Sequence, residues 1–166
     1  DHLVVKNPIT GVEVGRLDLT SSQNLENIIK SSKRYDDWSS LSLNKRCKYI
    51  NILRKQIVRN KEELQSILQS ETGKKEFDVF TELFGALEHL KQITKIAKKA
   101  LKPSYRSAGI MKSKKAYVLF EPRGIAGVIS PWNYPLTTPL TSVVGSLLAG
   151  NNVILKPSEH TPLTAV

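Results

Sequence analysis

The chain has 166 residues, of which 40% are hydrophobic, 7% aromatic and 24% charged. This composition is typical of a globular domain with its own core; it excludes disordered, collagen-like and coiled-coil chains, and no run of about 20 apolar residues is present to span a membrane. The formal net charge of +10 is compatible with an anionic partner, whereas the single cysteine excludes an internal disulfide and favours a reducing compartment, so we expect a cytoplasmic protein.

The first part of the chain predicts a hairpin followed by helices. Residues 3–19 alternate loosely around Asn7-Pro8 and Thr10-Gly11, which is typical of a short hairpin. Ser21 or Ser22 can cap the first helix. Its apolar residues fall roughly on one face and are Leu25, Ile28, Ile29 and Tyr35.

Two longer helices are expected next, and we interpret their apolar positions as packing faces. One begins at about Leu43 and runs to Gly73, which is placed like a C-cap glycine. Its apolar positions are Cys47, Ile50, Leu53, Ile57, Leu64, Ile67 and Leu68. The other helix is limited by Pro103 and carries Phe77, Phe80, Leu83, Phe84, Leu87 and Leu90.

From about residue 105 the pattern changes to strands, first at 116–120 and then at 125–130. The second run is apolar on both faces, which predicts a strand inside a parallel sheet covered by helices. Thr138 and Pro139 are placed as the cap and first turn of a helix that ends at Gly150, and residues 153–155 form another buried strand. The predicted fold class is therefore α/β, with a βαβ unit near the end of the chain.

Ligands of open parallel sheets bind beyond the carboxyl ends of the strands. The two predicted strands deliver residues 131–134 and 156–159 to that edge, and adjacent strands lie about 5 Å apart, so we expect both loops to face one cleft. The first loop offers an amide between two prolines, and the second offers a cation and a carboxylate three residues apart.

The same loops carry a resemblance to a known family. The PWNYP loop, the AGN turn and the KPSEHTP segment, all within residues 121–166, resemble the NAD(P)-dependent aldehyde dehydrogenase superfamily. Asn7-Pro8, Trp38-Ser39 and the Glu71-Thr72-Gly73-Lys74 segment look like N-terminal landmarks of that family in the usual order. Several fixed elements at family spacing are a stronger signal than any isolated motif.

The resemblance implies a division of the chain and a longer protein. Residues 1–104 would form a hairpin and helical layer, 105–121 exposed strands that could serve as an oligomerisation hairpin, and 122–166 an incomplete Rossmann-like dinucleotide-binding unit. Thr161 with Pro162 repeats the helix-start signal only one turn before Val166. We therefore expect the N-terminal portion of a longer enzyme, a homo-oligomer when complete.

By the resemblance, Asn133 donates its side-chain amide to the oxyanion of the thiohemiacetal intermediate. A fixed neutral donor stabilises the charge that develops on oxygen. Lys156 and Glu159 match the pair that bonds the adenosine ribose hydroxyls of NAD, with NADP as the alternative. The backbone that lines the cofactor cleft is Ser130, Pro131 and Trp132, with Trp132 as a packing wall, and Ser158 is a further residue that can reach the ribose or a 2′-phosphate. For a lone asparagine or an exposed ion pair, a purely structural role is the alternative.

The family's catalytic cysteine and general-base glutamate lie downstream of the matching region, so the chain should be inactive alone. Cys47 occupies a core-type position, Glu71 precedes a helix-ending glycine, and the histidines show no metal-ligand spacing. We read the chain as a fragment of an enzyme that oxidises a small aldehyde to a carboxylic acid. The alternative is a non-enzymatic remnant or basic module in which residues 95–115, rich in lysine and free of acids, bind nucleic acid or a membrane surface. That stretch also fits a solvated helix end and hairpin, so a nucleic-acid partner is not our expectation.

Overall fold

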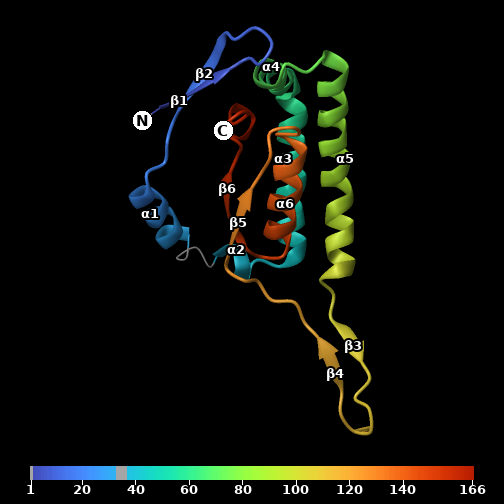
Figure 1. Ribbon diagram of the computed structural model, residues 1–166. Coiled ribbons are helices and arrows are strands. Elements are labelled where there is room, and N and C mark those ends of the chain that lie inside the picture. The colour runs from blue at the N-terminus through green and yellow to red at the C-terminus, as the bar shows by residue number, and fades with distance from the viewer. Residues whose placement is uncertain (1, 33–36) are drawn as a thin grey trace.

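The computed structural model describes residues 2–32 and 37–166, and its elements are labelled in Figure 1. The strands are β1 (His2–Lys6), β2 (Glu13–Asp18), β3 (Ser104–Arg106), β4 (Ala116–Val118), β5 (Ile125–Ile129) and β6 (Asn152–Lys156). The helices are α1 (Ser22–Ser32), α2 (Asp37–Ser40), α3 (Leu43–Arg59), α4 (Lys61–Thr72), α5 (Glu76–Ala100), α6 (Thr137–Leu148) and the 3₁₀ turn η1 (Leu163–Ala165). This mixture confirms the predicted α/β class.

The predicted N-terminal hairpin is formed by β1 and β2, which pair antiparallel. In its turn the Asn7 side-chain oxygen accepts the N–H groups of Ile9 and Thr10 at 2.9 and 3.0 Å. Its amide nitrogen donates to the carbonyl of Ser70 in α4, 2.8 Å away. One asparagine therefore closes the turn and ties the hairpin to the helical layer.

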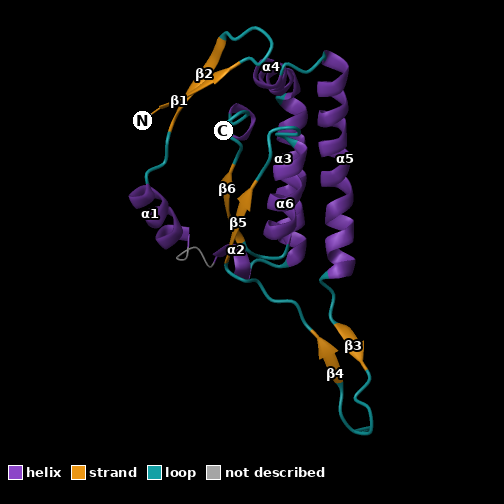
Figure 2. Ribbon diagram, in the orientation of Figure 1, coloured by secondary structure: helices purple, strands orange, loops and turns teal. Residues whose placement is uncertain are grey.

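The core lies between α3, α4, α5 and α6, of which α3, α5 and α6 run side by side in Figure 2. Helix α5 packs against α3, α4 and α6. The buried apolar residues that they share are Cys47, Ile50, Ile57, Leu68, Val79, Leu83, Ala86, Leu90, Ala97, Leu136, Val144 and Leu148. No helix within residues 2–32 or 37–166 combines the length and apolarity needed to cross a membrane.

The single helix predicted from Leu43 to Gly73 is wrong, because the structure divides it at Asn60. This residue has φ −101° and ψ 21°, and its N–H still bonds Gln56 O as the C-cap of α3. Asparagine favours such non-helical junctions, and Glu62 and Glu63 then occupy the first turn of α4, where carboxylates suit the helix dipole. Gly73 ends α4 as predicted, with φ +68°.

Two predicted packing faces are not covered within the described residues. Of the apolar residues expected to pack in α5, Phe77, Phe80 and Phe84 are exposed, while Val79, Leu83, Ala86 and Leu90 make the buried face. Ser21 caps α1 as expected, through Asn24 N–H at 3.2 Å, but the helix buries no residue. The position expected to pack at Tyr35 lies outside the described residues.

An exposed antiparallel hairpin, β3 and β4, extends away from the body of the molecule (Figure 1). The basic stretch 95–115 runs from the last turns of α5 into this hairpin. It therefore occupies a helix end and an exposed hairpin, which is the arrangement expected for a solvated basic segment.

The predicted βαβ unit is present, because β5 and β6 pair in parallel and α6 packs against both strands. The burial predicted for β5 is only partly correct, since Ile129 is 82% exposed. The reason is that α6 covers one face of this two-stranded sheet. The helix-start signal at Thr161 and Pro162 produces the short turn η1.

Candidate active site

The PWNYP and KPSEHTP loops leave the sheet at the same edge. Ile129 at the end of β5 is the register partner of Lys156 at the end of β6, and Ser130 N–H continues the ladder to Lys156 O at 3.1 Å. Beyond the strands, the Thr161 hydroxyl donates to Trp132 O at 3.3 Å. The prediction that both loops lie together at the carboxyl edge is confirmed.

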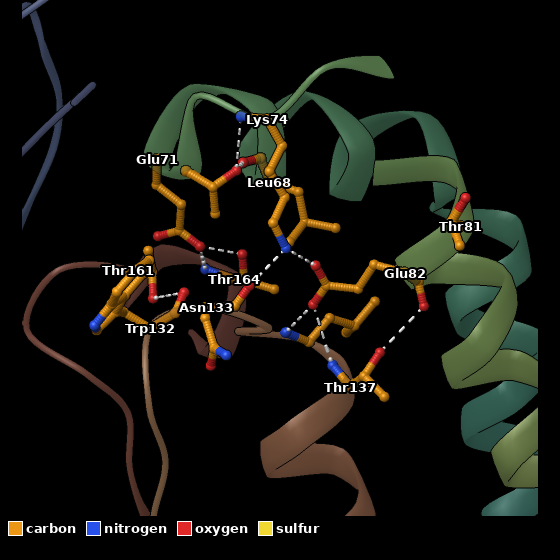
Figure 3. A network of polar contacts seen from close by, with 12 residues as sticks. Leu68, Glu71, Lys74, Thr81, Glu82, Trp132, Asn133, Thr137, Thr161 and Thr164 are labelled. Atoms are coloured by element: carbon orange, nitrogen blue, oxygen red, sulfur yellow. Dashed lines mark hydrogen bonds and ion pairs between the residues drawn. The ribbon is translucent and has the colours of Figure 1, made fainter. Parts of the chain in front are cut away.

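Asn133 is exposed at this edge, and its backbone oxygen and its side-chain amide differ in whether they are hydrogen-bonded. Its backbone oxygen accepts a hydrogen bond from the Lys74 ammonium at 2.6 Å. Its side-chain amide points away from Lys74 (Figure 3) and has no hydrogen-bond partner among residues 2–32 and 37–166. The local bonds expected if this asparagine only held the turn are therefore not made, and the amide is free to donate to a ligand.

Glu82 of α5 fixes the chain that follows Asn133. Its carboxylate accepts the N–H groups of Leu136 and Thr137 at 2.9 and 3.3 Å. Its carbonyl accepts the Thr137 hydroxyl at 3.1 Å. The cap of α6 predicted at Thr138 is wrong: the cap is Leu136, two residues earlier, and its N–H and that of Thr137 are accepted by a glutamate from another helix.

Glu71 fixes the residues that follow the other loop in the same way, by accepting backbone N–H groups. It is buried, and its carboxylate accepts Leu163 N–H at 2.7 Å and Thr164 N–H at 3.1 Å, with a further bond from the Thr164 hydroxyl. Burial raises the pKa of this carboxyl, against the lowering effect of the three donors. The buried glutamate caps η1 and holds the end of the KPSEHTP segment.

Lys156 and Glu159 form an ion pair, with the ammonium 2.9 Å from the carboxylate and both side chains 60% exposed. The N–H of Glu159 itself and then the Lys156 ammonium hold the pKa of this carboxyl below its usual value. A charged donor and a charged acceptor therefore stand together at the carboxyl end of β6, free to exchange partners with a ligand.

Of the other predicted cofactor-site residues, two are exposed and two are buried. Pro131 and Trp132 are exposed, and Trp132, expected as a packing wall, has 60% of its surface free. Ser130 is buried within the ladder. Ser158 is only 6% exposed, and its hydroxyl accepts the His160 N–H at 3.3 Å, so it closes the turn within the loop.

Comparison with known proteins decides the family. The model of the aldehyde dehydrogenase family matches residues 1–166. The chain belongs to the aldehyde dehydrogenase family. A putative succinate-semialdehyde dehydrogenase [NADP(+)] 2 of Mycobacterium ulcerans is 29% identical over 167 residues, which cover 100% of this chain and 31% of that protein. Aminoaldehyde dehydrogenase 2 of Solanum lycopersicum is 27% identical over 170 residues, covering 100% and 34%.

The fold agrees with solved aldehyde dehydrogenases. The crystal structure of an aldehyde dehydrogenase from Brucella melitensis biovar abortus 2308 superposes with a TM-score of 0.92 at 24% identity, covering 99% of this chain and 34% of that one. The chain thus spans about a third of the length of its relatives, in keeping with the predicted resemblance to the N-terminal portion of the family.

Cys47, the single cysteine, is no candidate for the family's nucleophile. It is buried in α3, its thiol contacts Thr94 O at 3.7 Å, and burial raises its pKa. A thiol of this kind is rarely the reactive thiolate. Within residues 2–32 and 37–166, no group of three or more His, Cys, Asp or Glu side chains is placed to hold a metal ion.

Sequence reasoning noted the segment of Glu71 and Lys74 only as a family landmark and passed over Glu82, so it missed that these three residues hold the loops. Lys74 and Glu82 are eight residues apart, but their partners in the loop lie 59 residues away for Lys74 and 54 or 55 for Glu82, and those of Glu71 lie 92 or 93 away. A signal was available nonetheless. Glu82 follows Val79 and precedes Leu83 and Ala86 in a buried helix face, and a charge in such a place is almost always paired.

Proposed function

We propose that the complete protein is an NAD(P)-dependent aldehyde dehydrogenase that converts a small aldehyde to a carboxylic acid. In that enzyme this chain supplies one hydrogen-bond donor to the reacting oxygen and the ribose end of the cofactor site. The observation that carries the proposal is Asn133: its backbone is fixed by Lys74, and its exposed amide has no partner among the described residues.

The chemistry explains why an amide is needed. When a nucleophile attacks an aldehyde carbon, negative charge develops on the oxygen. A neutral N–H donor that is already oriented stabilises this charge without reorganisation, and it acts only as the charge forms. Asn133 can supply this donor, because its backbone is held by Lys74 and its amide makes no competing bond within the described part of the chain.

The residues at the end of β6 fit the ribose of a nicotinamide cofactor. The Lys156 ammonium is a donor and the Glu159 carboxylate is an acceptor, which together match a vicinal diol. When bound, the cofactor accepts a hydride, so that the aldehyde and water become a carboxylic acid. Ser130, Pro131 and Trp132 would line the cleft, and Ser158 would support the loop beneath it.

A charged Glu159 favours NAD over NADP, because a carboxylate repels a 2′-phosphate. The mycobacterial relative is named for NADP(+), so NADP is the alternative. The proposal names no particular aldehyde as the substrate, since the relatives are named for different aldehydes.

Replacing Glu159 by glutamine or Lys156 by alanine in the complete enzyme should weaken NAD binding by about 10-fold or more, because a charge-assisted bond to the ribose is lost. The dissociation constant of NAD, titrated by fluorescence, measures the effect. Glu88→Gln, in another exposed Lys–Glu pair spaced three residues apart, is the control and should leave it unchanged. Equal affinities in all three variants would remove these residues from the cofactor site.

The proposed function is tested by restoring the residues that follow Val166 in the gene. The completed protein should form NADH or NADPH from an aldehyde, whereas the 166-residue chain should form none, because its one cysteine is buried. Reduced cofactor is measured by absorbance. Activity of the 166-residue chain that survives Cys47→Ala would contradict the proposal, and so would an inactive completed protein that binds no cofactor.

Two further parts of the proposal concern assembly and compartment. The hairpin of β3 and β4 exposes Tyr105 and Tyr117 to solvent, and such an extended apolar element suits contact between copies of the complete enzyme. The single cysteine suits the reducing cytoplasm.

A further inference from the structure

A single ammonium group links the α4–α5 turn to the PWNYP loop. Lys74 follows the left-handed Gly73, and its Nζ atom lies 2.6 Å from the Glu82 carboxylate and 2.6 Å from the Asn133 carbonyl oxygen. The same atom is 4.2 Å from the centre of the Tyr134 ring. Figure 3 shows Lys74 and Glu82 on one side of the loop and the Asn133 side chain on the other.

Burial strengthens the ion pair in this arrangement. The Glu82 side chain is fully buried and that of Lys74 is 20% exposed, so the ion pair is screened far less than a surface pair. Because Glu82 also accepts the amides of Leu136 and Thr137, the loop is held twice. Lys74 holds the carbonyl of Asn133, and Glu82 holds the chain three and four residues later.

The side chain of Asn133 cannot orient itself by its own bonds, since it makes none among the described residues. Its direction is therefore set by the backbone, and the bond nearest to it is the one from Lys74 to the Asn133 carbonyl. A donor misplaced by about 1 Å can cost as much as 10²-fold in rate. Loss of the Lys74 bond should therefore displace the Asn133 amide from the reacting oxygen.

We propose that Lys74 is a positioning residue for catalysis, which holds the Asn133 carbonyl while paired with Glu82 and thereby aims the Asn133 amide at the reacting oxygen. The inference rests on the proposed function. It assigns a role in the reaction to a lysine that acts through the backbone of Asn133.

The test is a double-mutant cycle in the completed enzyme, with single-turnover acylation and NAD affinity measured for each variant. Lys74→Met keeps most of the side-chain length and removes the charge and its donors. We expect acylation to slow by about 10-fold or more, with the NAD dissociation constant within about twofold of the parent. Lys74→Arg, which keeps a cation and donors, should recover part of the rate. Lys91→Met removes the lysine of an exposed ion pair with Glu88 in α5, the helix that carries Glu82, and is the matched control.

The cycle separates positioning from mere stabilisation. In the Asn133→Ala background, Lys74→Met should cause no further slowing, because there is no amide left to aim. Glu82→Gln is a second route to the same test. The side-chain oxygen of the glutamine can still accept the N–H groups of Leu136 and Thr137, but the ion pair with Lys74 is lost. Acylation should therefore slow, while NAD affinity should be kept.

Each opposing result has a distinct meaning. If Asn133→Ala slows acylation but Lys74→Met and Glu82→Gln leave it at the parent rate, the positioning role is overturned and the proposed function stands. If the effects of Lys74→Met and Asn133→Ala multiply, Lys74 acts only as a structural residue and the positioning role is again overturned. If Asn133→Ala itself leaves acylation unchanged, the oxyanion role fails and the inference fails with it.

Discussion

In the complete enzyme, replacing Asn133 by alanine is expected to slow acylation by about 10²- to 10³-fold, the usual effect of removing one oriented donor to an oxyanion. The free aldehyde carries little charge on its oxygen, so the lost bond matters mainly in the transition state. Single-turnover acylation should therefore fall, while the NAD dissociation constant should stay near its parent value, because Lys156 and Glu159 lie on the other loop.

Asn133→Asp is the informative companion variant. It has almost the same shape, but a carboxylate offers acceptors where a donor is required, so it should be at least as slow as Asn133→Ala. The Lys74 bond is to the backbone of residue 133 and is kept in both variants. A variant whose only defect was weaker cofactor binding would show that the PWNYP loop serves the cofactor and not the reacting oxygen.

The parts of the fold that sequence predicted well are those coded by neighbouring residues. The first hairpin, the end of α4 at Gly73 and the parallel pair of β5 and β6 each depend on local spacing and turn residues. The edge where both loops meet followed from the βαβ pattern alone. The break at Asn60 was missed because the apolar spacing runs through it, although an asparagine followed by acidic residues is a helix-start signal.

The sequence alone could not show which face of each helix is covered by a neighbouring element. The exposed Phe80 and Phe84 are four residues apart and the buried Leu83 and Leu90 seven, and both spacings fit one face of a helix. Only the placement of α3, α4 and α6 around α5 distinguishes the two faces. The candidate site divides in the same way. Asn133 stood out because its motif is local, whereas the contacts of Lys74 and Glu82 with the PWNYP loop and the start of α6 reach across more than 50 residues, so no local spacing points to them.

Replacing the buried Glu82 by methionine is expected to lower the free energy of unfolding of the chain by about 3 kcal/mol, near the lower end of the range for breaking a buried ion pair. Methionine fills similar space, so the loss is not one of packing. Two amides at the start of α6 lose their acceptor, and Lys74 keeps only the Asn133 carbonyl as a hydrogen-bond partner among the described residues. The partial exposure of Lys74 lets water compensate in part, which places the value at the lower end of the range.

Urea unfolding of Glu82→Met beside the parent chain measures this loss, and two variants isolate its cause. Glu88→Met on the same helix removes a glutamate whose pair with Lys91 is exposed, and it should change stability by less than about 0.5 kcal/mol. The double variant Lys74→Met with Glu82→Met removes both charges, and it should be less destabilised than the sum of the single variants, since neither member of this pair is then left without its partner. Additive losses would mean that the two residues do not act as a pair, and that the amides of Leu136 and Thr137 account for the whole contribution of Glu82.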